Sequence, residues 1–189
     1  MVALSVVLAC EAVPEPERAP AAAGADTMST AMRAALAEFR TTVHGPPPTT
    51  ITGGAATRAE LIRQFADAIA RADTAALIRM TMSRAEFAFL HYPHTIYIHP
   101  PYELDAETSW MLSRANTEKG LTRILQRFAG QPFDVVAYRC PEEPRREGPN
   151  RYYDRCTLQR AGSPPDMRWF GSIWERAGRF KFASYANDF

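Results

Sequence analysis

The stretch MRWFGSIWERAGRFKFASYANDF, residues 167–189, is predicted to form two antiparallel strands joined by a tight turn. Residues of the first strand fall into two alternating sets, Trp169, Ile173 and Glu175 against Phe170, Ser172 and Trp174. Gly178 follows Ala177 and permits the positive φ of a two-residue turn, after which Phe180 and Phe182 resume the alternation. Strands so rich in aromatic residues need a face to bury against, and an amphipathic helix near residue 60 can supply it.

The size and charge of the chain limit its class. With 189 residues and a net charge of +1, it suits one domain plus an extension. A hydrophobic share of 46% is enough for a core. A near-neutral charge argues against nucleic acid as a partner, because phosphate binding needs a basic surface. No zinc-finger or P-loop pattern and no membrane-spanning apolar run is present in the sequence.

The first ten residues, MVALSVVLAC, form an apolar run that ends in a small residue and a cysteine. This run resembles the end of a bacterial lipoprotein signal, with residues 7–10 at the lipobox positions. The resemblance implies that Cys10 carries a lipid, that the membrane is a partner, and that the chain is exported to the bacterial cell envelope. The alternative is a free cysteine at an apolar N-terminus.

Residues 11–56 are interpreted as a tether that is rich in Pro and Ala. Glu11–Ala25 and Gly45–Ala56 are expected to be disordered, because their Pro-Glu-Pro, Pro-Pro-Pro and Gly-Gly runs offer nothing to pack. Between them, a short helix is predicted over residues 27–40, with one apolar face made by Met28, Met32, Leu36 and Phe39. We expect that helix to dock on the domain or to be marginal.

The other two cysteines favour export. Cys140 ends one predicted strand and Cys156 lies in the next, so an antiparallel hairpin centred near residue 148 would place them at disulfide distance. A disulfide is typical of a protein outside the cytoplasm. The alternative is a pair of buried thiols in a cytosolic protein. The loop Glu142–Arg151 mixes acids and bases and is interpreted as a solvated hairpin tip.

The folded domain is predicted to span residues 57–189 and to belong to the α+β class. Thr57 and Glu60 form a capping-box pattern before an apolar stripe, Asp73 can cap a second helix, and Ser83 with Glu86 opens a third. A longer helix is predicted over residues 105–128, with a break at Gly120. Four strands are predicted near residues 133–140, 151–160, 167–176 and 179–186, forming one antiparallel meander that follows the helices.

Two stretches carry a resemblance to a known superfamily. ARADTAAL, residues 70–77, resembles the helix–helix corner of nuclear transport factor 2-like domains, the superfamily that includes ketosteroid isomerase and polyketide-cyclase-like proteins. WERAGRFKFASY, residues 174–185, is similar to their final hairpin. The resemblance implies a curved sheet wrapped around helices, with an apolar pocket inside the cone. Residues 91–130 depart from the pattern, being longer and more helical than the usual connection.

Candidate catalytic groups are few. His91, His94 and His99 suggest metal ligands, but Pro93 interrupts their spacing and no carboxylate pair or cysteine completes a set, so neither a metal nor another cofactor is expected. Enzymes of the superfamily place acids and a tyrosine inside the cone, and the groups of that type here are Glu86, Asp134, Tyr138 and Asp154. For each of them a solvated or capping role is the simpler interpretation.

The aromatic residues indicate binding better than catalysis. Phe87, Phe89 and Trp110 are assigned to packing, whereas the loop Tyr92–Tyr102 is rich in polar-tipped rings that suit recognition. The candidate ligand- or partner-binding residues are Tyr92, His94, Tyr97, Tyr102, Trp169 and Trp174. The sequence therefore favours an exported, lipid-anchored protein that binds a small apolar ligand or a cell-envelope protein without catalysis. The alternative is an isomerase, cyclase or hydrolase that uses carboxylates in the pocket.

Overall fold

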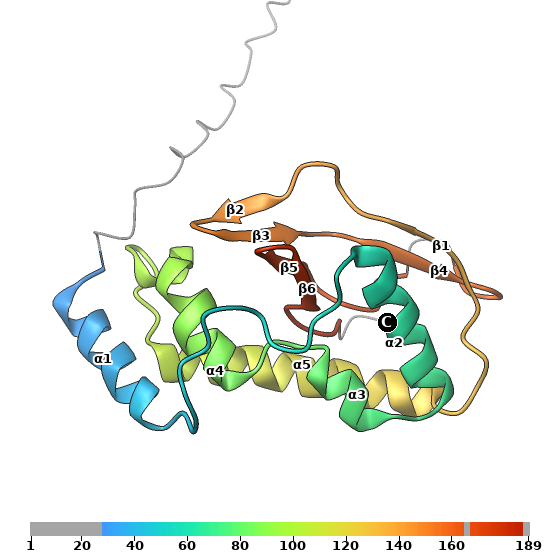
Figure 1. Ribbon diagram of the computed structural model, residues 1–189, viewed down its shortest axis with the longest axis horizontal. Helices are drawn as coiled ribbons and strands as arrows, with labels where there is room; N and C mark the ends of the chain where they lie inside the picture. Colours follow the sequence, from blue (N-terminus) through green and yellow to red (C-terminus); the bar gives the residue numbers. More distant parts are fainter. Residues whose placement is uncertain (1–27, 165–166, 187–189) are drawn as a thin grey trace, which may run out of the picture.

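A computed structural model of the protein describes residues 28–164 and 167–186. Its helices come first and its strands follow, so the predicted α+β class is confirmed (Figure 1). The helical elements are α1 (Thr30–Thr41), α2 (Arg58–Ala70), α3 (Thr74–Arg79), α4 (Arg84–Glu86), the π-helical turn η2 (Phe87–His91), the 3₁₀ turns η3 (Tyr92–His94) and η4 (Ile96–Ile98), and α5 (Ala106–Phe128). The strands are β1 (Val135–Arg139), β2 (Arg145–Glu147), β3 (Asn150–Tyr153), β4 (Thr157–Arg160), β5 (Ile173–Arg176) and β6 (Arg179–Phe182).

Three helices begin at the capping residues predicted from the sequence. The side chain of Thr57 starts α2 and that of Asp73 starts α3, each by accepting a backbone N–H of the first turn. At α4, Ser83 Oγ accepts the N–H of Glu86 at 3.2 Å, and Glu86 Oε2 accepts the N–H of Ser83 at 2.8 Å. This is the reciprocal capping box, and it fixes the direction of the Glu86 carboxylate.

The strands form two antiparallel sheets instead of the single predicted sheet. One has four strands in the order β2-β3-β5-β6, and the other pairs β1 with β4. The strand predicted over residues 151–160 is divided into β3 and β4, because Arg155 between them has φ +56°, which a strand cannot accommodate. The expected solvated loop tip contains β2, where Glu147 is only 7% exposed, and Asn150 beyond it is fully buried, so that part of the interpretation is wrong.

The four-stranded sheet is covered on both faces. Ile173 and Phe182 pair across β5 and β6 and face the first core cluster, where Phe65 of α2 lies 5.4 Å from the Phe182 ring. Trp174 and Tyr152 pair across β5 and β3 and face a second cluster formed with α1, η2 and the start of α5. Both faces of β5 are therefore buried, and a polar residue on this strand or its neighbour β6 must find a partner inside the protein.

The C-terminal hairpin confirms the prediction from its sequence. Arg176 pairs with Arg179, and the two residues between them, Ala177 and Gly178, have φ of +50° and +74°. Positive φ at both central positions is the signature of a type I′ turn, whose twist matches that of the strands. Regular pairing is shorter than predicted, since β5 begins at Ile173.

Residues 28–56 belong to the folded domain, which corrects the expected boundary at residue 57 and the expected disorder of residues 45–56. Helix α1 docks through Leu36 and Phe39, which are buried. Ile51 and Ala55 are buried further along, and Ala55 exchanges two backbone hydrogen bonds with Phe180. Residues 1–10 and 11–25, with the predicted lipid anchor Cys10, lie outside the described residues.

Helix α5 is continuous through Gly120, so the predicted break is wrong. A Cβ at Gly120 would lie 2.1 Å from the carbonyl oxygen of Ala186. The glycine is therefore required for the close approach of the C-terminal segment, not for a bend. That segment is held by Tyr185, whose hydroxyl donates to the Leu77 carbonyl at 2.7 Å.

The predicted disulfide is confirmed. Cys140 and Cys156 are bonded, with their Cα atoms 4.2 Å apart. The bond lies beside the pair Arg139 and Thr157, at the end of the ladder between β1 and β4. The pairing of these strands centres on residue 148, so each cysteine has the partner that the predicted hairpin register gives it.

Candidate functional site

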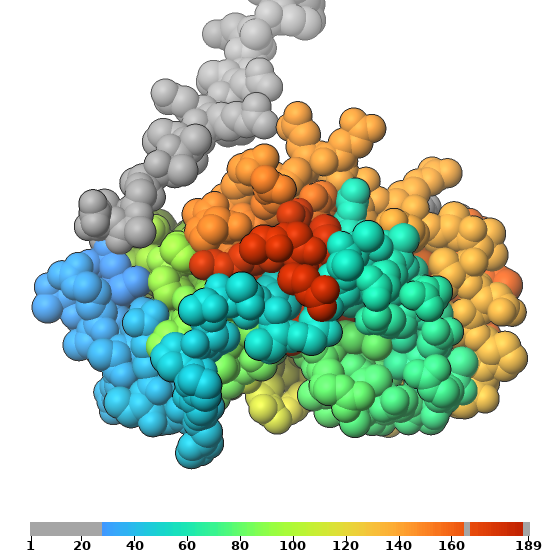
Figure 2. Space-filling view, viewed as in Figure 1, coloured from blue at the N-terminus to red at the C-terminus, as the bar shows by residue number. Residues whose placement is uncertain are grey.

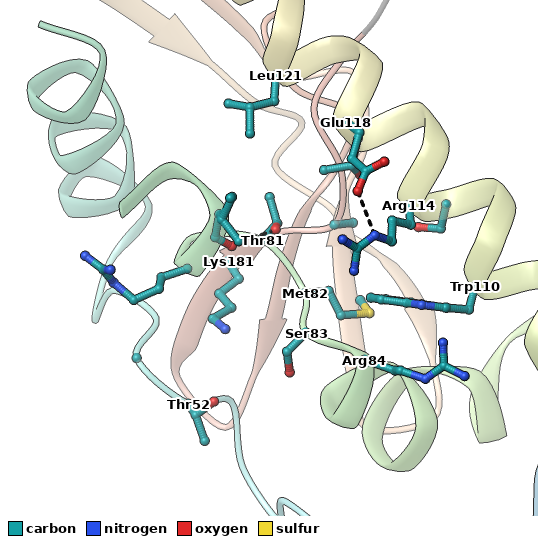
Figure 3. A pocket seen from close by; sticks show the side chains of 16 residues that line it. Thr52, Thr81, Met82, Ser83, Arg84, Trp110, Arg114, Glu118, Leu121 and Lys181 are labelled. Carbon is teal, nitrogen blue, oxygen red and sulfur yellow. Dashed lines mark hydrogen bonds and ion pairs between the residues drawn. The ribbon is translucent and has the colours of Figure 1, made fainter. Parts of the chain in front are cut away.

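A cavity of about 640 Å³ lies between the four-stranded sheet edge and α5 (Figure 3). Its walls are the segment 78–84, the residues 110–121 of α5, the end of β6, and Thr52 with Gly53. In Figure 2 the yellow surface of α5 is visible in a recess between the cyan segment that precedes α2 and the green α3. A volume of this size falls within the range of small-molecule sites.

Backbone hydrogen bonds fix the wall of the cavity that joins α3 to α4. Met82 donates its N–H to the Phe182 carbonyl at 3.1 Å, and Phe182 donates to the Met80 carbonyl at 2.9 Å. Thr81 therefore bridges to Phe182 in the parallel sense, as an added edge of the sheet. This wall of the cavity is therefore joined to the sheet edge by backbone hydrogen bonds.

The polar end of the cavity is organised by Glu86 and Lys181. Lys181 Nζ lies 3.0 Å from Oε1 and 2.9 Å from Oε2 of Glu86, and the side chains are 4% and 0% exposed. Glu86 also accepts from the N–H of Thr52 at 2.8 Å, from its hydroxyl at 3.0 Å, and from the N–H of Ser83 at 2.8 Å. Five hydrogen bonds from four donor atoms thus hold this carboxylate.

The apolar part of the cavity is formed by side chains from three elements. In Figure 3 Met82 and Trp110 lie near Ser83, at the same end of the cavity as Lys181, and Leu121 lies at the other end, beside Glu118. Trp110 is buried and its ring centroid lies 5.3 Å from that of Phe87, so packing fixes the indole. Ile78 completes the wall and is 57% exposed. The cavity therefore offers both hydrogen-bonding groups and hydrocarbon surface.

Three further arginines line the cavity, and two of them have carboxylate partners. Arg84 pairs with Glu107 at 2.6 Å in a partly exposed position, and Arg114 pairs with Glu118 at 2.7 Å in an exposed one. Arg79 is exposed at the mouth. The electrostatic character of the lining is thus basic, with Glu118 as the one acidic residue among the described residues that line it.

A second polar cluster lies between η2 and the hairpin of β2 and β3. Tyr152 Oη is 2.5 Å from His91 Nδ1, and Arg145 pairs with both Glu147 and Asp154. Burial, with Arg145 and His94 nearby, lowers the pKa of His91 to about 4. Burial raises the pKa of Glu147 against the opposing effect of Arg145.

This second cluster binds the hairpin to the helical segment. Glu147 Oε2 is buried and has no hydrogen-bond partner among the described residues. Asn150 links the same parts, since its Nδ2 donates to the Leu90 carbonyl at 2.8 Å while its Oδ1 accepts from Trp174. None of these residues lines the 640 Å³ cavity.

The structure does not bring the six predicted binding residues together. Tyr92 is buried and donates to the Leu104 carbonyl at 2.7 Å, and both Trp169 and Trp174 are fully buried with their indole N–H groups hydrogen-bonded. His94 is partly buried, and burial together with Arg176 lowers its pKa.

Only two of the six predicted residues are exposed. Tyr97 and Tyr102 are 44% and 56% exposed, and their ring centroids are 5.4 Å apart. None of the six lines the cavity.

The four candidate catalytic groups are also separate. Asp134 is exposed, Tyr138 lies on β1 against the first core cluster, and Asp154 accepts from Arg145 and Ser172. Glu86 alone reaches the cavity, through Lys181. Across residues 28–164 and 167–186, no group of His, Cys, Asp and Glu is placed to hold a metal ion.

Sequence reasoning missed Lys181 and assigned Trp110 to packing alone. In the alternation of the C-terminal hairpin, Lys181 lies on the other face of the sheet from Phe180 and Phe182. In an ordinary two-layer fold that face would be exposed to solvent. The capping-box pattern at Ser83 and Glu86 could have indicated a partner for Lys181. In such a box the carboxylate lies at the start of the helix, where a cation from another segment can reach it. Finding the partner required the tertiary contact between residues far apart in the chain.

Comparison with protein-family models, with curated proteins and with solved structures finds no match to the chain. The resemblance to nuclear transport factor 2-like domains therefore stays a prediction. Of the helices in the described part of the chain, none has the length and apolar character to cross a membrane.

Proposed function

We propose that the protein is an exported, lipid-anchored protein of the bacterial cell envelope whose domain binds a small molecule in the 640 Å³ cavity without catalysing a reaction. The observation that carries the proposal is the cavity itself, which offers both hydrogen-bonding groups and apolar surface. A few polar groups that orient a ligand within a mostly apolar lining are typical of binding sites.

The Glu86 carboxylate supports binding over acid–base chemistry. Its two oxygens already accept five hydrogen bonds from Thr52, Ser83 and Lys181. A general base needs a lone pair within reach of the proton that it removes. Glu86 would have to break one of these bonds first, so its role is to hold Lys181 at the cavity.

The disulfide supports export. Cys140–Cys156 is the kind of bond that persists in oxidising compartments. The lipid anchor is tested by feeding a labelled fatty acid to bacteria that express the full chain. We expect label on the wild type and none on Cys10→Ala, and equal labelling of both would refute the anchor.

Native mass spectrometry of the full chain, before and after denaturation, tests the binding. We expect a small molecule that leaves on denaturation. Thr117→Trp should exclude it, because Thr117 lines the cavity and the indole would occupy the space. Ala115→Trp, at an exposed position of the same helix outside the lining, is the matched control and should retain it. Equal retention in both variants would contradict binding at this cavity.

A second candidate function is recognition of an envelope protein by the loop Tyr92–Tyr102. The observation in its favour is the exposed pair Tyr97 and Tyr102, with Ile96 beside them at 50% exposure. Such amphipathic rings are enriched at protein interfaces. Crosslinking in intact cells should capture a partner with the wild type and lose it with the double variant Tyr97→Ser, Tyr102→Ser, while Thr117→Trp leaves it unchanged.

A further inference from the structure

We infer that the ligand of the cavity is a single-chain amphiphile with an anionic head group, whose head lies at Lys181 and whose tail lies toward Leu121. This inference rests on the proposed function, because it names the chemistry of the molecule that the cavity takes. Three observations carry it: an excess of hydrogen-bond donors at Lys181, an excess of positive charge, and a set of apolar side chains in the lining that extends to Leu121, away from Lys181.

The donors at the polar end exceed the acceptors. Lys181 has three N–H bonds and directs two of them to Glu86, which leaves one for the cavity that it lines. Ser83 uses its oxygen to accept from Glu86 and retains its own hydrogen to donate. Glu86 has no capacity left to accept. A head group that fits this end must therefore supply acceptors.

Arg84, which also lines the cavity, has one donor that the described residues leave unsatisfied. Its Nε is buried and has no hydrogen-bond partner among the described residues, although Arg84 lines the cavity. Its terminal nitrogens are engaged by Glu107 and Thr42, and its guanidinium lies 4.2 Å from the centroid of the Phe39 ring. A buried donor without a partner is rare in a native structure and is commonly explained by an absent water or ion.

The charge around the cavity is positive. Four cationic residues line it, namely Arg79, Arg84, Arg114 and Lys181. Their carboxylate partners among the described residues are Glu107, Glu118 and Glu86, which leaves Arg79 without one. One positive charge is thus in excess, beside walls that exclude water from one side. An anion gains from this field and a cation loses.

The apolar residues of the lining provide a surface for an alkyl tail. Ile78, Met82, Trp110 and Leu121 present hydrocarbon, aromatic and thioether surface, and Leu121 lies at the end opposite Lys181 in Figure 3. Hydrophobic contact between an alkyl chain and these residues contributes to affinity without fixing how the ligand is oriented. The hydrogen-bond donors at Lys181 and Ser83 fix that orientation. A small polar anion would leave these apolar side chains without contact, so an amphipathic ligand fits the lining better.

The test is a titration of the full chain with four probes that share one ten-carbon tail: decanoate, decyl phosphate, decanol and decyltrimethylammonium. Binding is followed by the fluorescence of Trp110, with Trp110→Phe as the control that assigns the signal. We expect decanoate or decyl phosphate to bind about tenfold or more tighter than decanol, because hydrogen bonds to charged groups are the strong ones. Decyltrimethylammonium should not bind, and the comparison of the two anions identifies the head group.

Single substitutions test whether the positive charges account for the binding of the anions, independently of any effect on folding. Lys181→Met is unsuitable alone, since it leaves Glu86 buried without a cation. Arg79→Gln and Arg84→Gln should each weaken the binding of the anions severalfold and leave that of decanol unchanged. Arg63→Gln, at an exposed position of α2 outside the lining, is the matched control. Circular dichroism of each variant verifies that it is folded.

The outcomes distinguish the two proposals. If decanol binds as tightly as decanoate, the cavity is a ligand site but the anionic head group is refuted. If none of the probes binds and native mass spectrometry finds no ligand, both proposals fail. If the anions bind preferentially but Thr117→Trp does not affect them, they bind elsewhere, and the assignment of the cavity is overturned.

Discussion

Lys181 donates two hydrogen bonds to the carboxylate of Glu86, to Oε1 at 3.0 Å and to Oε2 at 2.9 Å, across 95 residues of sequence. Both side chains are removed from water, at 4% and 0% exposure. The pair joins the start of α4 to β6 and forms the polar end of the cavity. Because desolvation of both charges is costly, the pair contributes little net stability by itself, but removal of one member leaves the other uncompensated.

Lys181→Met is expected to lower the free energy of unfolding by about 3–5 kcal/mol, the usual cost of breaking a buried ion pair. Urea denaturation followed by far-UV circular dichroism measures it. The double variant Glu86→Gln, Lys181→Met should recover part of the loss, since no buried charge remains. A loss below about 1 kcal/mol for the single variant would show that Glu86 reaches water.

Gly120→Ala is expected to destabilise, although helix propensity predicts a gain. An alanine in a helix interior is favoured over glycine by about 0.5–1 kcal/mol. Here the added Cβ would lie 2.1 Å from the Ala186 carbonyl oxygen, so the C-terminal segment must move, at a cost of about 1–3 kcal/mol.

The matched control for Gly120→Ala is the reverse exchange at an exposed position of the same helix. Ala115→Gly should cost about 1 kcal/mol from propensity alone. Thermal unfolding of the two variants measures both effects. A rise in melting temperature for Gly120→Ala would show that the contact with Ala186 is not maintained in solution.

Ala177→Asn is expected to stabilise the protein by about 0.5–1 kcal/mol. Ala177 is exposed and has φ +50°, which costs an L-residue about 1–2 kcal/mol and which asparagine tolerates better. Urea denaturation of the variant against the wild type gives the difference. Ala115→Asn, in a regular helix, is the control and should destabilise instead.

The free energy of unfolding is expected to fall as the pH is lowered from 6.5 to about 4. In the folded state burial, Arg145 and His94 hold the pKa of His91 at about 4, below its ordinary value of 6.5. Above pH 6.5 the imidazole is neutral in both states, so it adds no pH dependence. Between these values the unfolded chain takes up a proton that the folded protein does not, which favours unfolding by up to about 3 kcal/mol.

His91→Gln should flatten this part of the pH profile while retaining a hydrogen-bonding group for Tyr152. Urea denaturation at a series of pH values measures the slope. The lowered pKa of His94 acts in the same direction, so a smaller residual slope is expected. His44→Gln, at an exposed position, should leave the profile unchanged. An unaltered slope in His91→Gln would contradict the assignment.

Local patterns predicted the parts of the fold that depend on neighbours in sequence. The caps at Thr57, Asp73 and Ser83 were correct, because a side chain of the right type three residues before a free N–H closes a short ring. The turn at Ala177 and the bond between Cys140 and Cys156 were correct for the same reason, since strand alternation and hairpin register are local rules.

Patterns failed where a distant element changes the meaning of a residue. The segment before α2 is rich in Gly and Pro, which predicts disorder, yet Gly54 is needed because a Cβ there would lie 2.6 Å from the Phe180 carbonyl oxygen. At Gly120 a helix break is predicted because the sequence does not reveal the close approach of the Ala186 backbone. In both positions the absence of a side chain permits a close approach of two backbones.

By itself the sequence determined that helices precede strands, the helix caps, the final hairpin and the cysteine pairing, because each follows from propensity and spacing within a short segment. Only the tertiary structure decided that helices cover both faces of the sheet, and hence that Lys181 is buried. The contact of Lys181 with Glu86, and the cavity that this pair helps to form, depend on packing between segments that no local period relates. A site built from such contacts becomes visible only when the chain has folded.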